Sequence, residues 1–159
     1  MMTTNIILLS FIMVVFLAYT LGIYFAFGVT SSISSSIHKL QGPIQKSLYS
    51  WFMLGIAIPF MIVSDTPLGW WAGALLAIDF AAPAGGDKMQ NFLHCFGAEV
   101  GMLLGMLMLI IDFGQWLIVI PTAIIVIYLQ YYKVKNHTWW VECVVFAAAW
   151  IGLLIEKVL

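Results

Sequence analysis

The stretch IILLSFIMVVFLAYTLGIYFAFGV, residues 6–29, decides the fold class of this chain. It contains no charged residue, and it exceeds the ~20 mostly apolar residues with which a helix crosses a bilayer. It is also too long for the apolar core of a signal peptide, and residues 1–5 hold no Lys or Arg. We therefore predict that this stretch is a membrane span that the protein retains.

The rest of the chain has the same apolar character. Of its 159 residues, 64% are hydrophobic and 8% are charged, whereas an ordinary soluble domain carries about 25% charged residues. Too few charges are present to cover a water-exposed surface, so lipid is predicted to surround most of the chain. The length fits a single domain, residues 1–159.

Charged and turn-forming residues divide the chain into six apolar segments, which predicts an all-α, polytopic transmembrane helical bundle. The predicted spans are 6–29, 47–64, 69–83, 91–111, 116–132 and 139–155. The run Thr30–Ser36 breaks the first helix, because serine hydroxyls compete for the backbone bonds of a helix. An alternative has five spans, with residues 69–82 as a re-entrant segment.

The distribution of lysines favours six spans over five. The first, third and fifth connectors between the predicted spans carry Lys39, Lys46, Lys88, Lys133 and Lys135. The even connectors carry Asp65 and Asp112, and Lys157 lies near the C-terminus. Alternate connectors lie on one side of a membrane, and lysine-bearing connectors face the cytoplasm. We therefore expect both termini outside the cytoplasm, most naturally in a bacterial inner membrane.

Three glycines mark the fourth span as a packing helix. Gly97, Gly101 and Gly105 recur every four residues, which places them on one stripe of a helix. Small residues at this spacing let two helices approach closely in lipid. We expect the stripe to pack on another span of the same chain or, alternatively, on a second copy in a homo-oligomer.

Four ionisable residues fall inside the predicted spans, where such residues are costly and tend to be functional or paired. They are Asp79, His94, Glu99 and Glu142. Because successive spans run in opposite directions, Asp79, His94 and Glu142 fall at a similar depth in the cytoplasmic half. One interpretation is a polar cavity that binds a ligand. The other is that these groups pair with one another, or reach the interface, only to be tolerated in lipid.

Other functions remain open from the sequence, including enzymatic ones. A metal-dependent hydrolase could draw ligands from His38, His94, His137 and Asp79 if the loops fold inwards. The chain contains neither a His-x-x-x-His nor a His-Glu-x-x-His motif, so no metal or cofactor is assigned. A small oligomeric channel could use Glu99 or Glu142 as an acidic ring. A structural subunit of a membrane assembly is a further alternative.

Nucleic acid is not an expected partner. The formal net charge is −1, and the six basic residues are all lysines placed singly along the chain. Neither a basic patch nor an arginine fork is present to neutralise phosphates.

Cysteines and interfacial aromatic residues are predicted to be structural. Cys95 and Cys143 lie in apolar runs and are interpreted as small buried hydrophobes, with a disulfide between two spans as the alternative. Aromatic residues near the predicted span ends suit the belts that such side chains form at membrane surfaces. These residues are Trp116, Tyr131, Tyr132, Trp139 and Trp140.

Short motifs add a family resemblance over about residues 30–100. Ser32-Ile33-Ser34, Ala81-Ala82-Pro83 and His94-x-x-Gly97-Ala98 resemble small uncharacterised six-span membrane proteins of gut bacteria and phages. Their order is similar, more distantly, to the six-span family of autophagy modulators and GPI-anchor-remodelling proteins. The resemblance implies six helices, lipid handling, and shared roles for the serine run and His94. The last two spans carry no matching motif.

Together these features predict an integral membrane protein whose partners are membrane lipids. Its leading predicted function is binding a lipid or small solute in a cavity on the cytoplasmic side, formed by Asp79, His94, Glu99 and Glu142.

Overall fold

The computed structural model of the chain describes residues 2–40, 43–81 and 88–158, with side chains except those of residues 43–46 and 79–81. In these ranges every regular element is helical. The elements are α1 (Met2–Phe27), the 3-10 helix η1 (Ser34–His38), α2 (Pro43–Ser64), α3 (Pro67–Ala81), α4 (Lys88–Ile111), α5 (Trp116–Tyr131) and α6 (His137–Val158). The predicted all-α class is confirmed.

Four helices are long and apolar enough to cross a membrane: α1, α4, α6 and residues 47–64 of α2. The helices α3 and α5 are apolar but shorter, with 15 and 16 residues. At the α-helical rise they measure about 22 and 24 Å, less than the ~30 Å of a bilayer's hydrocarbon core. The helical membrane protein predicted from the sequence is thus supported, while the count of six complete crossings stays a prediction.

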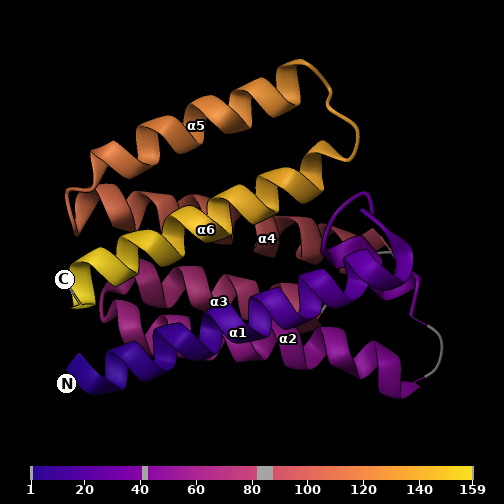
Figure 1. Cartoon of the computed structure of the whole chain (residues 1–159), viewed down its shortest axis with the longest axis horizontal. Coiled ribbons are helices and arrows are strands. Elements are labelled where there is room, and N and C mark those ends of the chain that lie inside the picture. Colours follow the sequence, from indigo (N-terminus) through magenta and orange to yellow (C-terminus); the bar gives the residue numbers. More distant parts are fainter. Residues whose placement is uncertain (1, 41–42, 82–87, 159) are drawn as a thin grey trace.

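The helices lie side by side between two ends of the molecule, and both chain termini lie at the same end (Figure 1). The helix α3 packs between α2 and α4, and α1 packs on α2 and α6. The helix α5 lies at the edge of the bundle against α6 and α4 (Figure 1). The helices α1, α2, α4 and α6 thereby surround a central space.

Tight turns connect the helices at the end that carries the termini. Asp65 follows α2 with a φ of +52°, and the Thr66 Oγ1 then accepts the Gly69 N–H at 3.1 Å. That bond satisfies one of the free backbone donors in the first turn of α3. After α4, Gly114 has a φ of +67° and its N–H binds the Ile110 carbonyl oxygen at 3.0 Å. A glycine in this left-handed conformation ends a helix without steric cost.

The glycine stripe of α4 packs inside the chain. Gly97, Gly101 and Gly105 are all buried. A Cβ atom on Gly101 would lie 3.2 Å from the Ala72 carbonyl oxygen of α3, and one on Gly105 would lie 3.9 Å from the Phe60 ring of α2. A glycine at position 101 thus suits the close approach of α3 and α4. The stripe faces the inside of the bundle, where Gly101 packs on α3 and both Gly101 and Gly105 line the central cavity.

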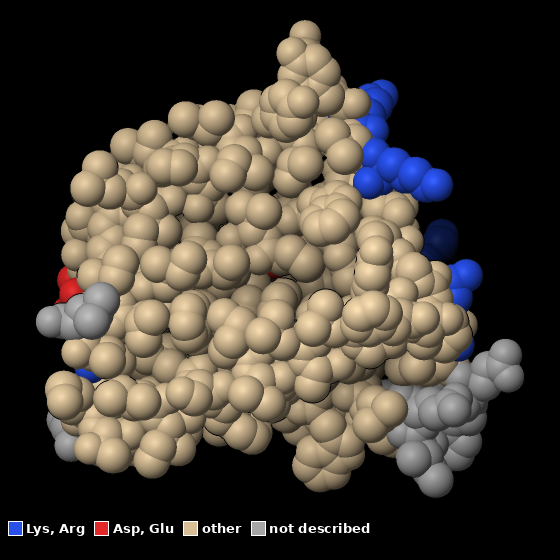
Figure 2. All heavy atoms as spheres, in the orientation of Figure 1, with Lys and Arg blue, Asp and Glu red and all other residues tan. Residues whose placement is uncertain are grey.

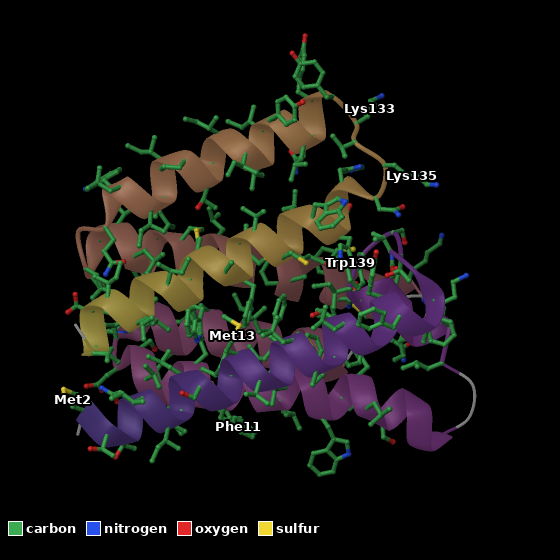
Figure 3. The ribbon with its side chains drawn as sticks, viewed as in Figure 1. Met2, Phe11, Met13, Lys133, Lys135 and Trp139 are labelled. Atoms are coloured by element: carbon green, nitrogen blue, oxygen red, sulfur yellow. The ribbon has the colours of Figure 1, made fainter. Side chains whose placement is uncertain are left out.

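Lysines gather at the end of the bundle opposite the termini (Figure 2), apart from Lys157 in the last turn of α6. Lys133 and Lys135 lie at that end, whereas Met2 lies at the other (Figure 3). The helix η1, which Lys39 follows, and the start of α4 at Lys88 lie at the same end as the connector between α5 and α6 (Figure 1). The side chain of Lys46 lies outside the described part. The lysines of the odd connectors in the sequence thus lie at one end of the folded bundle.

Large apolar side chains cover the outside of the bundle. Leu117 is 91% exposed, Phe25 80% and Trp51 72%. In α5 only Val119 and Thr122 are buried. An exposed apolar surface this extensive is unfavourable in water and natural against lipid.

Two predictions about individual side chains are wrong. Trp139 was expected at the membrane interface, but it is 3% exposed, because its backbone N–H binds the Ser31 carbonyl oxygen and its ring packs in the core. Cys95 was expected to be buried, but it is exposed on the outside of α4, while Cys143 is half-buried. Both thiols are free, so the disulfide alternative is also wrong. Trp116, Trp140 and the two tyrosines are exposed, as a belt requires.

Candidate functional site

The serine segment, residues 30–40, follows α1 and contains only the short helix η1. Hydrogen bonds of its hydroxyl groups stabilise its backbone. The hydroxyls of Thr30 and Ser35 donate to the Ser32 carbonyl oxygen at 2.7 and 2.8 Å. The Ser32 hydroxyl in turn accepts the Ser35 N–H at 3.0 Å. Because Ser34 and Ser36 are buried, their polar groups need hydrogen-bond partners within the protein. Hydroxyl and carbonyl groups of the same segment supply several of these partners.

Two of the predicted site residues hold this segment from different helices. His94, early in α4, places its Nε2 3.0 Å from the Ser34 hydroxyl, and both side chains are buried. Glu142, early in α6, accepts the Ile33 backbone N–H through its Oε2. Both residues lie within about two turns of the start of their helix, at the lysine end. Ile33 and Ser34, which are consecutive in the serine segment, thus form hydrogen bonds with Glu142 and His94, respectively.

Further contacts bind the segment to α1 and to the connector before α6. The Ser36 hydroxyl donates to the Ile33 carbonyl oxygen, so the Tyr19 hydroxyl of α1 donates to Ser36 at 2.7 Å. The Asn136 side chain, between α5 and α6, donates to the Val29 carbonyl oxygen at 2.9 Å. The serine segment is therefore a built part of the bundle and forms a cap over its lysine end.

The predicted convergence of four ionisable residues is realised only in part. His94 and Glu142 meet at the serine segment. Glu99 does not join them, since it is exposed on the outside of α4. It lies ~140° around the helix from His94, and His94 lies on the buried face of α4. Asp79 lies in α3, but its side chain is outside the described part of the structure.

A cavity lies beneath the serine segment between α1, α2, α4 and α6. Ser34 and Glu142 line one end, and Leu9 and Leu153 line it toward the chain termini. The distance along α6 from Glu142 to Leu153 is ~16 Å at the helical rise. The cavity volume is about 110 Å³. The cavity is therefore long and narrow, and an apolar chain of several carbon atoms would fit in it.

The cavity wall is apolar except near the serine segment. Phe16 and Phe146 line its middle and stack with ring centroids 3.7 Å apart. The Trp150 indole also lines the cavity, and its N–H donates to the Leu9 carbonyl oxygen at 2.9 Å. A ligand in this cavity would therefore find hydrocarbon along most of its length and hydrogen-bonding groups at one end.

A metal centre finds no support among the residues that the structure describes. No three His, Cys, Asp or Glu side chains come together there as a metal-binding group. Zinc requires about three such ligands with one position open. The side chains of His38, His94 and His137 therefore do not form the metal site considered from the sequence, and the side chain of Asp79 lies outside the described part.

Comparison with known proteins gives no relative for this chain: no family model, curated protein or solved structure matches it. The resemblance of residues 30–100 to six-span membrane families therefore stays a prediction. Function must be argued from the site, since a helical bundle alone does not define it.

Several residues of the site did not stand out individually in the sequence. Ser34 is the one that both lines the cavity and contacts His94. Tyr19 is an aromatic residue in an apolar span, and Ile33 takes part through its backbone N–H and carbonyl oxygen. The high density of hydroxyl side chains between residues 30 and 36 is the sequence signal that points to this segment, because such side chains can satisfy the polar groups of a buried segment.

Proposed function

We propose that this protein binds a single-chain lipid, with the hydrocarbon chain in the central cavity and the polar group against the serine segment. The observation that carries the proposal is the placement of the lining residues: Ser34 and Glu142 lie together at one end of an otherwise apolar cavity. A molecule with one polar end and one apolar tail matches that distribution. A small polar solute would leave most of the wall without a partner.

The width of the cavity favours a single chain over a double-chained phospholipid. Its wall includes Phe16, Phe146 and Leu153, which leave a narrow space of about 110 Å³ for the centres of water-sized spheres. Each methylene group transferred from water to such a wall contributes about 0.8 kcal/mol. A chain already dissolved in the bilayer gains less, so specificity would come from the fit and from the polar end.

The polar end favours an uncharged head. Glu142 lines the cavity, and its carboxyl group accepts the Ile33 N–H. A fatty-acid carboxylate next to an ionised Glu142 would meet like-charge repulsion, which the apolar surroundings strengthen. An ester or alcohol can instead exchange hydrogen bonds with the Ser34 hydroxyl. The favoured ligand class is therefore a neutral fatty ester or monoacyl lipid.

The proposal includes six membrane crossings with the serine segment on the cytoplasmic side and both termini outside. It is supported by the lysines at one end, which follow the positive-inside rule. The short helices α3 and α5 can cross if the bilayer thins locally, as it does around short spans. Trp70, Trp71 and Trp116 lie near their N-terminal ends and are exposed, which suits anchoring at the interface.

Lipid analysis of the purified protein tests the binding proposal. The protein would be extracted in a mild detergent, delipidated by exchange, incubated with a radiolabelled monoacylglycerol and separated from free lipid. We expect stoichiometric retention by the wild type. Ala149→Phe places a ring in the cavity that Ala149 lines and should reduce retention at least tenfold.

The matched control is Ala147→Phe, which adds the same ring two residues away in α6, outside the cavity lining. This variant should retain the lipid like the wild type. Equal retention by Ala149→Phe and the wild type, with both proteins folded by size-exclusion chromatography, would contradict a chain in the central cavity.

A further inference from the structure

The contact between Ser34 and His94 has the geometry of a nucleophile and its base. The Ser34 Oγ lies 3.0 Å from the His94 Nε2. Ser34 is 7% exposed and His94 is 5% exposed, so bulk water has little access to either. Ser34 also lines the polar end of the cavity. A serine hydroxyl becomes a useful nucleophile when a histidine within hydrogen-bond reach can take its proton.

Neighbouring hydrogen bonds direct the Ser34 proton toward His94. The Ser32 Oγ accepts the Ser35 N–H at 3.0 Å, which leaves the hydrogen of the Ser32 hydroxyl free to donate. Ser34 Oγ lies 3.0 Å from that hydroxyl and can accept its hydrogen. When the His94 ring carries its proton on Nδ1, the single hydrogen of Ser34 then points to the His94 Nε2. This is the direction of donation that general-base activation requires.

Anchoring alone does not account for this pair. Glu142 already holds the Ile33 N–H from α6, and Tyr19 already holds Ser36 from α1. Ser36 does not line the cavity, whereas Ser34 does. The serine that contacts a histidine is thus also the serine closest to a ligand bound in the cavity.

We propose that Ser34 and His94 form a metal-independent acyl-transfer dyad that hydrolyses the ester bond of a monoacyl lipid, an activity that rests on the proposed binding of such a lipid in the cavity. Ser34 is the nucleophile and His94 is the general base. The fatty chain lies along the apolar wall, which places the ester group at the only polar end of the cavity that the described residues form.

The reaction balances with water as its second substrate. Ser34 Oγ bonds to the ester carbonyl carbon while its proton passes to the His94 Nε2. The carbon–oxygen bond to the alcohol breaks, and the departing oxygen takes that proton from His94. Water then attacks the acyl-serine, giving a proton to His94, which returns it to the Ser34 Oγ as the fatty acid departs. The protein ends in its starting state.

A long-chain alkyl fluorophosphonate, which phosphonylates activated serines, tests the proposal on the wild-type protein in detergent. We expect one adduct, located at Ser34 by peptide mass spectrometry. The adduct should be lost in Ser34→Ala and slowed at least about 100-fold in His94→Gln, as expected for removal of a general base. Ser10→Ala is the matched control, because Ser10 is exposed on α1 away from the segment, and it should react like the wild type.

Hydrolysis of radiolabelled monoacylglycerol gives the second measurement. Ser34→Ala should release no fatty acid, whereas Ser10→Ala should release it at the rate of the wild type. No adduct on folded wild-type protein, an adduct only at another serine, or unchanged hydrolysis by Ser34→Ala would each overturn the dyad. Retained lipid binding with no hydrolysis by the wild type would overturn the dyad and leave the binding proposal standing. Loss of binding by the wild type would overturn both.

Discussion

Glu142 in α6 accepts the backbone N–H of Ile33, a residue 109 positions earlier in the chain. This bond joins the last helix to the segment that follows the first helix, so it closes the bundle at its lysine end. A carboxylate that accepts an N–H forms a charge-assisted bond, which is stronger than a bond between two neutral groups. One side chain therefore fixes both the serine segment and the polar end of the cavity.

Replacing Glu142 should separate its hydrogen-bonding role from its charge. Glu142→Leu leaves the Ile33 N–H without its acceptor, so we expect the free energy of unfolding to fall by about 1.5–3 kcal/mol. Glu142→Gln keeps an acceptor oxygen and should lose less than half as much. Reversible unfolding in mixed micelles, followed by tryptophan fluorescence, measures both. A leucine variant as stable as the wild type would show that the bond contributes little.

The two glycines Gly101 and Gly22 should respond oppositely to alanine. A Cβ on Gly101 would lie 3.2 Å from the Ala72 carbonyl oxygen, whereas one on Gly22 would meet nothing within 4 Å. Gly101→Ala should therefore lower the free energy of unfolding by about 1–3 kcal/mol through overpacking. Gly22→Ala should raise it by about 0.5–1 kcal/mol, because alanine is the better helix former. Equal effects of the two substitutions would contradict close packing of α3 on α4.

Asn136 should be replaceable by glycine at a lower cost than by alanine. Its φ is +57°, and its side chain donates to the Val29 carbonyl oxygen at 2.9 Å. Asn136→Gly loses only the hydrogen bond, a loss of about 1 kcal/mol. Asn136→Ala loses the same bond and keeps a Cβ in the left-handed region, which alanine tolerates less well than asparagine, so it should lose about 1–2 kcal/mol more. Thermal unfolding of the three proteins in one detergent tests the order, and an alanine variant at least as stable as the glycine variant would contradict it.

The helices could be predicted from the sequence because charges interrupt the apolar runs. The fourth span was predicted at 91–111, and α4 covers Lys88–Ile111. The depth of His94 and Glu142 in the bundle could also be predicted. Because helix direction alternates, α4 and α6 run the same way, and both residues lie early in their helices. What binds them could not be predicted. Local sequence marks residues 30–36 as non-helical, but only the packed bundle shows that Ser34 and Ile33 turn inward to meet these two side chains.

The outward position of Glu99 illustrates the limit of reasoning from a single helix. The sequence places Glu99 on a different face of α4 from His94, yet we predicted that both would line one cavity. The structure turns the glycine stripe and His94 inward and leaves Glu99 exposed. The glycine stripe predicts one packed face of α4, but the sequence of α4 does not show how many further faces its neighbours cover.

The topology yields a last prediction, because the helices α3 and α5 are short for complete crossings. In a background with Cys95→Ala and Cys143→Ala, single cysteines at positions 39 and 135 should react with a membrane-impermeant maleimide only after the cytoplasmic side is opened. A cysteine at position 112, in the connector before α5, should react from the outside of intact cells. Six crossings place Lys39 and Lys135 on one surface and Asp112 on the other. Labelling of positions 39 and 135 from opposite surfaces would rule out this arrangement, and with it the cytoplasmic position of the serine segment.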